Sequence, residues 1–476
     1  MDSAATITYR RPFFSTSMLL MFSFLGLAYA VVGFAAFDDR HGVAGLYLLG
    51  LVQLTPFLVC MARRQFDFVS LIAVSYFLVV TVGKYNQIFI IDQNFQIDPI
   101  SRAAIRELTI SMLIIYSSYY FVRTFFCPTV DRTEQKKNAL LTMTPLLALF
   151  LLFIGAISPF VVVLLPSAVQ ALWTPVDSMV CVLLVCSACP RYPRLFVFGW
   201  ALVYLARVVY FFYSGTMGAV FFFSCTLFLA ALIRPNYLIL IVLTFATLVG
   251  MAVQSVKGQY RTVLLSAAHL SVLDRFETLE GLLALRYSGR SFTGPSDQDE
   301  DASPSLDAEA TRDGLSSGLN RLDDDSLERV LDQTPNRVPF WNGSSYSYIF
   351  FMFIPRALWP GKPGRTLWHE FGRKYGYLDD SDSITSVSVS YLAEGYMNFG
   401  YAGLYATALF MGCFIAFVEW LSDHVFGQYY HFSFLLFLIP ISTYSLDLSS
   451  IVSLTAMILA AGLAMRRPIL YYFTGA

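Results

Sequence analysis

The chain has 476 residues, of which 56% are hydrophobic and only 14% are charged. Soluble globular proteins carry about 25% charged residues, so this composition excludes an ordinary soluble domain and predicts an all-α polytopic membrane protein. The net charge of −1 says little as a total, because the charges are segregated along the chain.

Twelve apolar segments are long enough to cross a membrane, which takes about 20 residues. The first is too long for the core of a cleaved signal peptide and lacks a small-residue cleavage site, so we expect a retained anchor. The segments lie near 16–37, 43–62, 67–83, 107–126, 140–165, 170–189, 195–213, 216–233, 236–254, 401–421, 430–447 and 449–465. We therefore expect about twelve transmembrane helices.

The distribution of lysine and arginine in the short loops predicts the orientation, because such loops carry more cations on the cytoplasmic side. With the N-terminus inside, the inner loops and tails hold thirteen cations and the short outer loops hold four. The four outer cations are Arg40, Lys84, Arg102 and Arg106. Both termini are then cytoplasmic, and the long interval 255–400 faces outward.

Three regions follow from this layout: a bundle of about nine spans in 1–254, a large external loop in 255–400, and three spans in 401–476. Within the loop, residues 291–328 are acidic and serine-rich, a composition typical of disorder. The apolar run inside 344–360 is too short to span, so we expect a re-entrant or interfacial segment there.

The external loop contains a rigid cationic segment, Ile354–Pro363. Its three prolines fix φ and remove backbone donors, so it cannot continue as a regular helix. Arg356 and Lys362 lie between them, with Arg365 just beyond. Cations on irregular backbone at a membrane surface suit an anionic group such as phosphate. An arginine satisfied by backbone carbonyls is the structural alternative.

Lys257 and Arg261 leave the ninth predicted span at i, i+4 spacing and so share one helix face. At the outer surface they could grip one pyrophosphate, the arginine as a planar fork and the lysine as a point charge. Snorkelling cations at a helix end explain the pair equally simply.

Two side chains near the same surface are candidates for proton transfer. Glu394 and Asn398 are again i, i+4, just before the tenth span; the carboxylate could be a general base, orient the arginines or pair with a cation. His369, a histidine of the external loop, is the second candidate base, or simply a surface histidine. The sequence has no metal-binding signature and no nucleotide-binding loop, so no cofactor or metal is expected.

The external loop resembles the bacterial Wzy-type polymerases of O-antigen and exopolysaccharide repeat units. The resemblance rests on short motifs in order across roughly 255–403. These are Val256–Arg261, Asn320-Arg321-Leu322, Thr334-Pro335, Asn342–Tyr346, Ile354–Pro363 and Glu394–Gly400. The spans before residue 255 match this family only in hydropathy.

This resemblance implies a GT-C-like fold and a reaction at the periplasmic face of the bacterial inner membrane. An undecaprenyl-pyrophosphate-linked glycan is the donor, a hydroxyl of a second lipid-linked repeat unit attacks, and lipid pyrophosphate leaves. Cations would stabilise the leaving group: Arg356 as a catalytic residue, with Lys257, Arg261, Arg321, Lys362 and Arg365 binding pyrophosphate. Glu394 or His369 would accept the proton.

Sugar contacts are expected from Trp341, Tyr346, Trp359 and Asn398, although an interfacial aromatic belt would account for the same aromatic residues. The partners implied are the lipid-linked glycan and the bilayer, with a chain-length regulator and a flippase as candidate partner proteins and no nucleic acid. Two rival functions remain open, a ligase using the same lipid-linked donor and a transporter or flippase for lipid-linked glycan.

Overall fold

The computed structural model describes a helical part of this chain. The described residues are 43–63, 67–86, 97–126, 153, 157, 277–278, 280–282, 325–352, 359, 361, 367–378, 387–426, 444, 446–457, 459–460 and 463. No strand occurs among them. The chain separates into two compact units, Met1–Thr144 with Leu164–Met179 and Asp323–Ala476, and Pro145–Val163 with Val180–Leu322. All the contacts reported below lie within the first unit.

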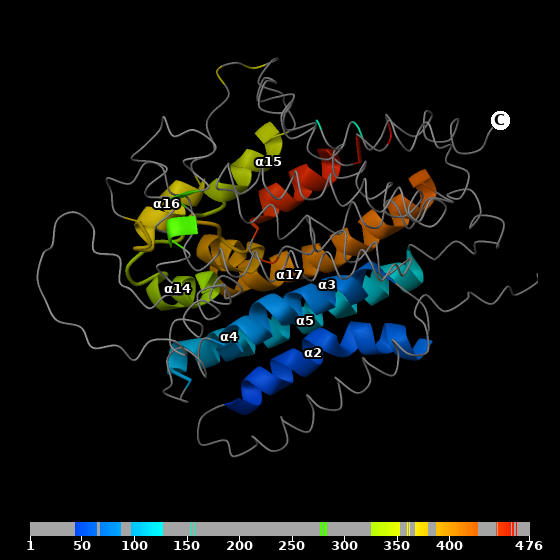
Figure 1. Cartoon of the computed structure of the whole chain (residues 1–476), viewed down its shortest axis with the longest axis horizontal. Coiled ribbons are helices and arrows are strands. Elements are labelled where there is room, and N and C mark those ends of the chain that lie inside the picture. Colours follow the sequence, from blue (N-terminus) through cyan, green and yellow to red (C-terminus); the bar gives the residue numbers. More distant parts are fainter. Residues whose placement is uncertain are drawn as a thin grey trace, which may run out of the picture. The chain divides into compact units, whose positions relative to one another are not determined.

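Among the described residues before position 127, four α-helices occur (Figure 1). They are α2 (Val43–Arg63), α3 (Phe68–Tyr76) with a π-helical extension (Phe77–Val82) into α4 (Gly83–Asn86), and α5 (Pro99–Phe125). The helices expected at 43–62, 67–83 and 107–126 are confirmed as helices, and α5 begins earlier than expected. Phe68–Tyr85 is long and apolar enough to cross a membrane.

Aspartate caps set the starts of α3 and α5. Asp67 accepts a hydrogen bond from Ser70 N (3.1 Å), and Asp98 accepts from Ile100 N and Ser101 N, both at 2.8 Å. Pro99 occupies the first helical position, where its fixed φ suits the helix and its missing N–H costs nothing. The capping carboxylate and this proline explain why α5 begins before its apolar stretch.

The second half of the first unit contains α14 (Ser326–Gln333), a 3₁₀ turn (Ser344–Tyr346), α15 (Ser347–Met352), α16 (Leu367–Lys374) and α17 (Tyr391–Phe426). A short apolar helix, Leu448–Met457, follows. The acidic segment expected to be disordered ends inside this structure: Glu328 lies in α14, and Asp325 occupies the N-cap position without a side-chain capping hydrogen bond. The prediction of disorder therefore does not hold for residues 325–328; the rest of 291–324 lies outside the described residues.

α17 consists of two arms joined by a reversal. Phe399 and Gly400 leave helical geometry, and Gly400 has φ +64°, a conformation that favours glycine. The arms 391–398 and 401–426 then pack against each other through two glycines. A Cβ on Gly395 would lie 2.7 Å from both Gly403 O and Thr407 Oγ1, so the contact requires hydrogen at this position. By length and composition Tyr391–Ser422 is the second described candidate span; the reversal divides it, and its second arm continues as helix to Phe426.

Helices α5 and α17 lie side by side and run in the same direction (Figure 1). Contacts advance together along both: Tyr405 with Glu107, Gly412 with Ser118, and Glu419 with Tyr119. The Gly412 position leaves no room for a Cβ, which would meet Ser118 Oγ and the carbonyl of Ile115. A small residue thus sets the close approach of these two helices.

Helix α2 runs parallel to α5, and α3 runs opposite to α2. Gln53 O accepts from Tyr116 of α5 at 3.3 Å, further along both helices than the contact of Gly45 with Ile105. In contrast, Ser70 at the start of α3 donates to Pro56 O, whereas Tyr85 at the end of α4 lies against Tyr47. Helix α5 in turn contacts α14 of the second half.

A buried ionic cluster joins α3, α5 and α17 at the end opposite Gly400. Glu419, 1% exposed, forms an ion pair with Arg123 (3.4 Å) and accepts hydrogen bonds from Tyr119 Oη and from Phe68 N at 3.3 Å. A buried charge needs such partners, because desolvation is otherwise costly. The cluster therefore fixes how α3 and α5 meet the second arm of α17.

Candidate functional site

The first arm of α17 lies beneath the loop that carries the Asn342–Tyr346 motif. Asn398 holds the two together: its Oδ1 accepts from Gly343 N (2.8 Å), and its Nδ2 donates to Ser345 Oγ (2.8 Å) and to Glu394 O (2.8 Å). The backbone adds a bond from Trp341 N to Met397 O at 3.0 Å. Asn398 is fully buried, and its side chain holds the loop on the helix; its contact with sugar stays a prediction.

Two left-handed residues shape this loop. Asn342 has φ +48° and Gly343 has φ +84°, conformations that asparagine and glycine tolerate best. A Cβ on Gly343 would also come within 3.0 Å of the Phe399 ring. The Asn-Gly dipeptide therefore lets the loop lie directly against the reversal of α17.

Glu394 lies fully buried in the first turn of this arm. Its Oε2 accepts a hydrogen bond from Leu448 N (2.7 Å), at the start of helix Leu448–Met457. Helix N-termini interact favourably with acidic side chains, so this contact holds the helix against the first arm of α17. The predicted general base is thus held in place by an element that lies more than fifty residues away in the sequence.

Asp447, which precedes this helix, is a second buried carboxylate beside Glu394 and was not identified from the sequence. Its Oδ2 caps the helix by accepting from Ser450 N (3.1 Å), and its Oδ1 accepts from Trp368 Nε1 (3.0 Å). Asp447 thereby fastens α16, the helix of His369, to the helix that contacts Glu394. An acid between two apolar stretches was the signal that could have revealed it.

Tyr346 brings a phenol close to this carboxylate. Burial and, after it, the charge of Glu394 raise the pKa of the Tyr346 hydroxyl far above its usual range, against the opposing effect of hydrogen bonds with Thr407 and Asn398. The hydroxyl lies 3.3 Å from Thr407 Oγ1, and the ring stacks on Phe399. Tyr346 consequently stays protonated and able to donate a hydrogen bond.

Trp341 of the loop contacts α16, the helix that carries His369. Lys374 Nζ lies 4.2 Å from the centroid of the Trp341 ring, a cation–π distance. The His369 Nδ1 and Trp341 Nε1 atoms are buried without a hydrogen-bond partner. Both predicted residues are therefore partly buried, and these two polar atoms are enclosed by the protein.

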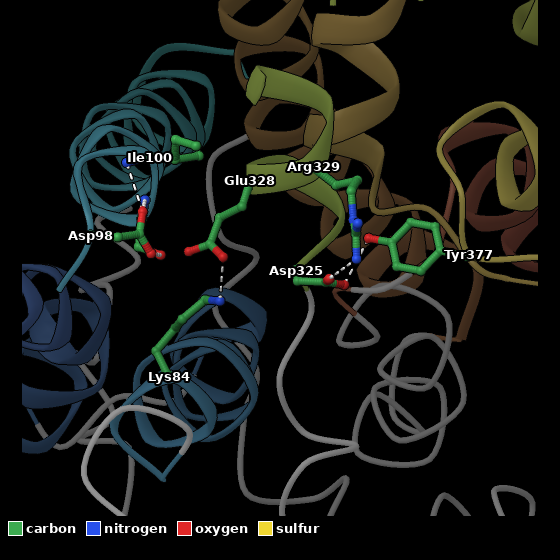
Figure 2. Close-up of polar contacts among 8 residues, drawn as sticks. Lys84, Asp98, Ile100, Asp325, Glu328, Arg329 and Tyr377 are labelled. Carbon is green, nitrogen blue, oxygen red and sulfur yellow. Dashed lines mark hydrogen bonds and ion pairs between the residues drawn. The ribbon is translucent and has the colours of Figure 1, made fainter. Parts of the chain in front are cut away.

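Helix α14 is fixed to α4 and to the segment after α16 by charged groups (Figure 2). Lys84, 3% exposed, forms an ion pair with Glu328 at 2.8 Å. Asp325 accepts from Tyr377 Oη at 2.8 Å, and the Arg329 guanidinium lies 4.6 Å from the Tyr377 ring centre. Burial, then the charge of Asp325, raises the pKa of Tyr377 well above its usual range, so this phenol remains a donor.

The predicted pyrophosphate-binding cations are not placed by the structure. Lys257, Arg261, Arg321, Arg356, Lys362 and Arg365 lie outside the described residues. Trp359 is described as partly buried, and its position relative to the other predicted sugar-binding residues is not established. Among the described residues, no group of three histidine, cysteine or acidic side chains could hold a metal ion.

One family model matches the chain, described as "Domain of unknown function (DUF8712)", over residues 319–439. The matched stretch contains α14 to α17 and therefore both sides of the Asn398 contact. None of the curated proteins and none of the solved structures compared with the chain matches it.

Proposed function

We propose that the chain is a Wzy-type polymerase with about twelve transmembrane helices and a GT-C-like architecture in the bacterial inner membrane. It would join undecaprenyl-pyrophosphate-linked repeat units at the periplasmic face and release lipid pyrophosphate. The observation that carries the proposal is the packing of the Asn342–Tyr346 motif on the Glu394–Gly400 motif through Asn398. Two motifs of the resemblance, far apart in sequence, thus support a single site.

The chemistry of this site fits glycosyl transfer. Glu394 would accept the proton of the attacking hydroxyl, held by Leu448 N in a position shielded from water. Tyr346, protonated beside it, would donate a hydrogen bond to a sugar oxygen. The cations of Ile354–Pro363, which enter the chain directly after α15, would receive the pyrophosphate.

The ends of the helices agree with the relative directions expected of these spans. Lys84 and Glu328, both expected on the same side, form an ion pair at one end of the bundle. Arg123 and Glu419, both expected at the opposite ends of their spans, pair at the other. A reversed assignment of any one of these helices would separate these partners.

The test is polymerisation by the purified protein in nanodiscs, supplied with lipid-pyrophosphate-linked repeat units and read as a ladder on a gel. Glu394→Gln removes the proton acceptor and keeps the shape, so the rate should fall by a factor of about 10² to 10⁴. Arg356→Ala should abolish the ladder through loss of leaving-group stabilisation. Asp332→Asn, an exposed acid of α14, is the matched control and should leave the ladder intact.

Each product identifies a different function. One-step transfer to an added lipid A core would make the protein a ligase, and movement of the lipid-linked glycan across the membrane without product would make it a transporter. A full-strength ladder from Glu394→Gln would retain the polymerase and remove Glu394 from its catalytic role. Gel filtration of each variant checks that the fold survives.

A further inference from the structure

An exposed arginine of α5, Arg106, is held in place beside the start of the second arm of α17. Arg106 donates to Glu107 Oε1 from Nε (3.0 Å) and from Nη2 (2.8 Å). Successive residues of a helix do not face each other, so the Arg106 side chain turns back to reach its neighbour. Its side chain is 66% exposed, whereas that of Glu107 is 3% exposed. A buried acid thereby fixes the direction of a guanidinium that remains open to solvent.

Tyrosines of α17 complete the surroundings of this pair. Tyr405 Oη donates to the other oxygen of Glu107 at 2.6 Å. Tyr401, 46% exposed, has its ring centre 6.4 Å from Tyr405 and 5.1 Å from Tyr396. Tyr396 in turn lies 6.4 Å from Phe340. A series of aromatic rings therefore leads from the loop of the proposed site to Arg106.

The charge balance of this group favours a neutral ligand. Glu107 already neutralises Arg106, so a free anion would gain little from the guanidinium and would be repelled by the carboxylate. The donors at Nη1 remain unused by Glu107 and point in a plane fixed by the ion pair. An exposed tyrosine ring next to fixed planar donors suits a sugar, which has hydroxyls at its edge and C–H groups on its face.

We propose that Arg106 and Tyr401, held by Glu107 and Tyr405, form a binding subsite for an uncharged sugar residue of the glycan. The identity of the glycan rests on the proposed function; the preference for a neutral sugar does not. This subsite lies on the transmembrane helices, apart from the motifs of the external loop. It would hold a sugar away from the reacting bond and so contribute to the choice of repeat unit.

Binding without turnover tests the subsite. The probe is the free oligosaccharide released by mild acid from the native host's lipid-linked repeat unit, added to the full-length protein in uncharged nanodiscs. Saturation-transfer NMR should detect sugar protons close to the protein. Arg106→Ala and Tyr401→Ala should each raise the dissociation constant about tenfold, which is the loss of affinity expected for one fixed donor group or stacking surface.

Arg102→Ala is the matched control. Arg102 is an exposed arginine one turn earlier on α5 whose Nε donates to Ile97 O (2.9 Å), and its loss should leave sugar binding unchanged. Equal binding by wild type and Arg106→Ala would overturn the proposal, as would displacement of the oligosaccharide by inorganic pyrophosphate. If the wild type makes a polymer ladder and the two variants bind the oligosaccharide as well as the wild type does, the polymerase stands and the subsite is excluded. If the variants lose binding and the wild type makes no ladder, the subsite stands and the polymerase is excluded.

Discussion

Replacing Gly403 with alanine should displace the helix arm that carries Glu394. A Cβ at this position would lie 2.9 Å from Phe399 Cβ, 3.1 Å from the carbonyl carbon of Gly395 and closer still to the Gly395 oxygen. Two of these atoms belong to the backbone and cannot rotate away. The two arms of α17 must therefore separate by about 1 Å, a displacement that can cost a catalytic site about 100-fold in rate.

Stability should change much less than activity. Overpacking costs about 1–3 kcal/mol, and alanine returns about 1 kcal/mol of helix propensity relative to glycine, so the net loss is about 0–2 kcal/mol. Polymer yield in the purified system and thermal unfolding in detergent measure the two effects separately. Gly45→Ala is the control, because its Cβ would make an ordinary contact of 3.6 Å with Ile105. Wild-type activity in Gly403→Ala would refute the tight contact between the arms.

Two further predictions concern polar groups that hold the helices in place. Lys84→Met should destabilise the protein by about 3 kcal/mol, because it leaves Glu328 without its cation; adding Glu328→Leu should restore most of the loss in thermal unfolding. Asn398→Ala should cost about 2 kcal/mol through the unsatisfied Gly343 N and should speed proteolysis of the loop.

Each of these predictions has a result that would contradict its physical reason. Failure of Glu328→Leu to rescue Lys84→Met would show that Lys84 is stabilised by other groups. Unchanged proteolysis of Asn398→Ala would mean that the backbone bond from Trp341 N to Met397 O is sufficient to hold the loop.

Apolar periodicity and length predicted the helices at 43–62 and 67–83 closely, because a helix that buries an apolar face ends where the apolar residues end. The start of α5 was missed, although Asp98-Pro99 is a recognisable helix start. The reversal at Gly400 was not predicted either. Its signals, Gly395 and Gly403, acquire meaning only when the two arms meet, and a single sequence does not show that contact.

The candidate site residues were likewise predictable where local spacing relates them, and not where tertiary contacts do. The i, i+4 spacing correctly joined Glu394 to Asn398, since a helix places such residues on one face. The partners of both came from elsewhere: Leu448 for the carboxylate and Gly343 for the amide. Asp447 and Glu107 were overlooked as acids within or beside apolar stretches. Their importance follows from tertiary contacts with Trp368 and Tyr405, which local patterns do not encode.

The parallel packing of α5 and α17 restricts how the rest of the chain can be threaded. If both helices cross the membrane in the same direction, the segment between them must return the chain to its starting side, which requires an odd number of crossings. The five spans expected between 140 and 254 satisfy this parity. The number of spans between α5 and α17 could therefore be revised only by two at a time. Reporters fused just after residue 126 and just before residue 391 must report opposite faces of the membrane.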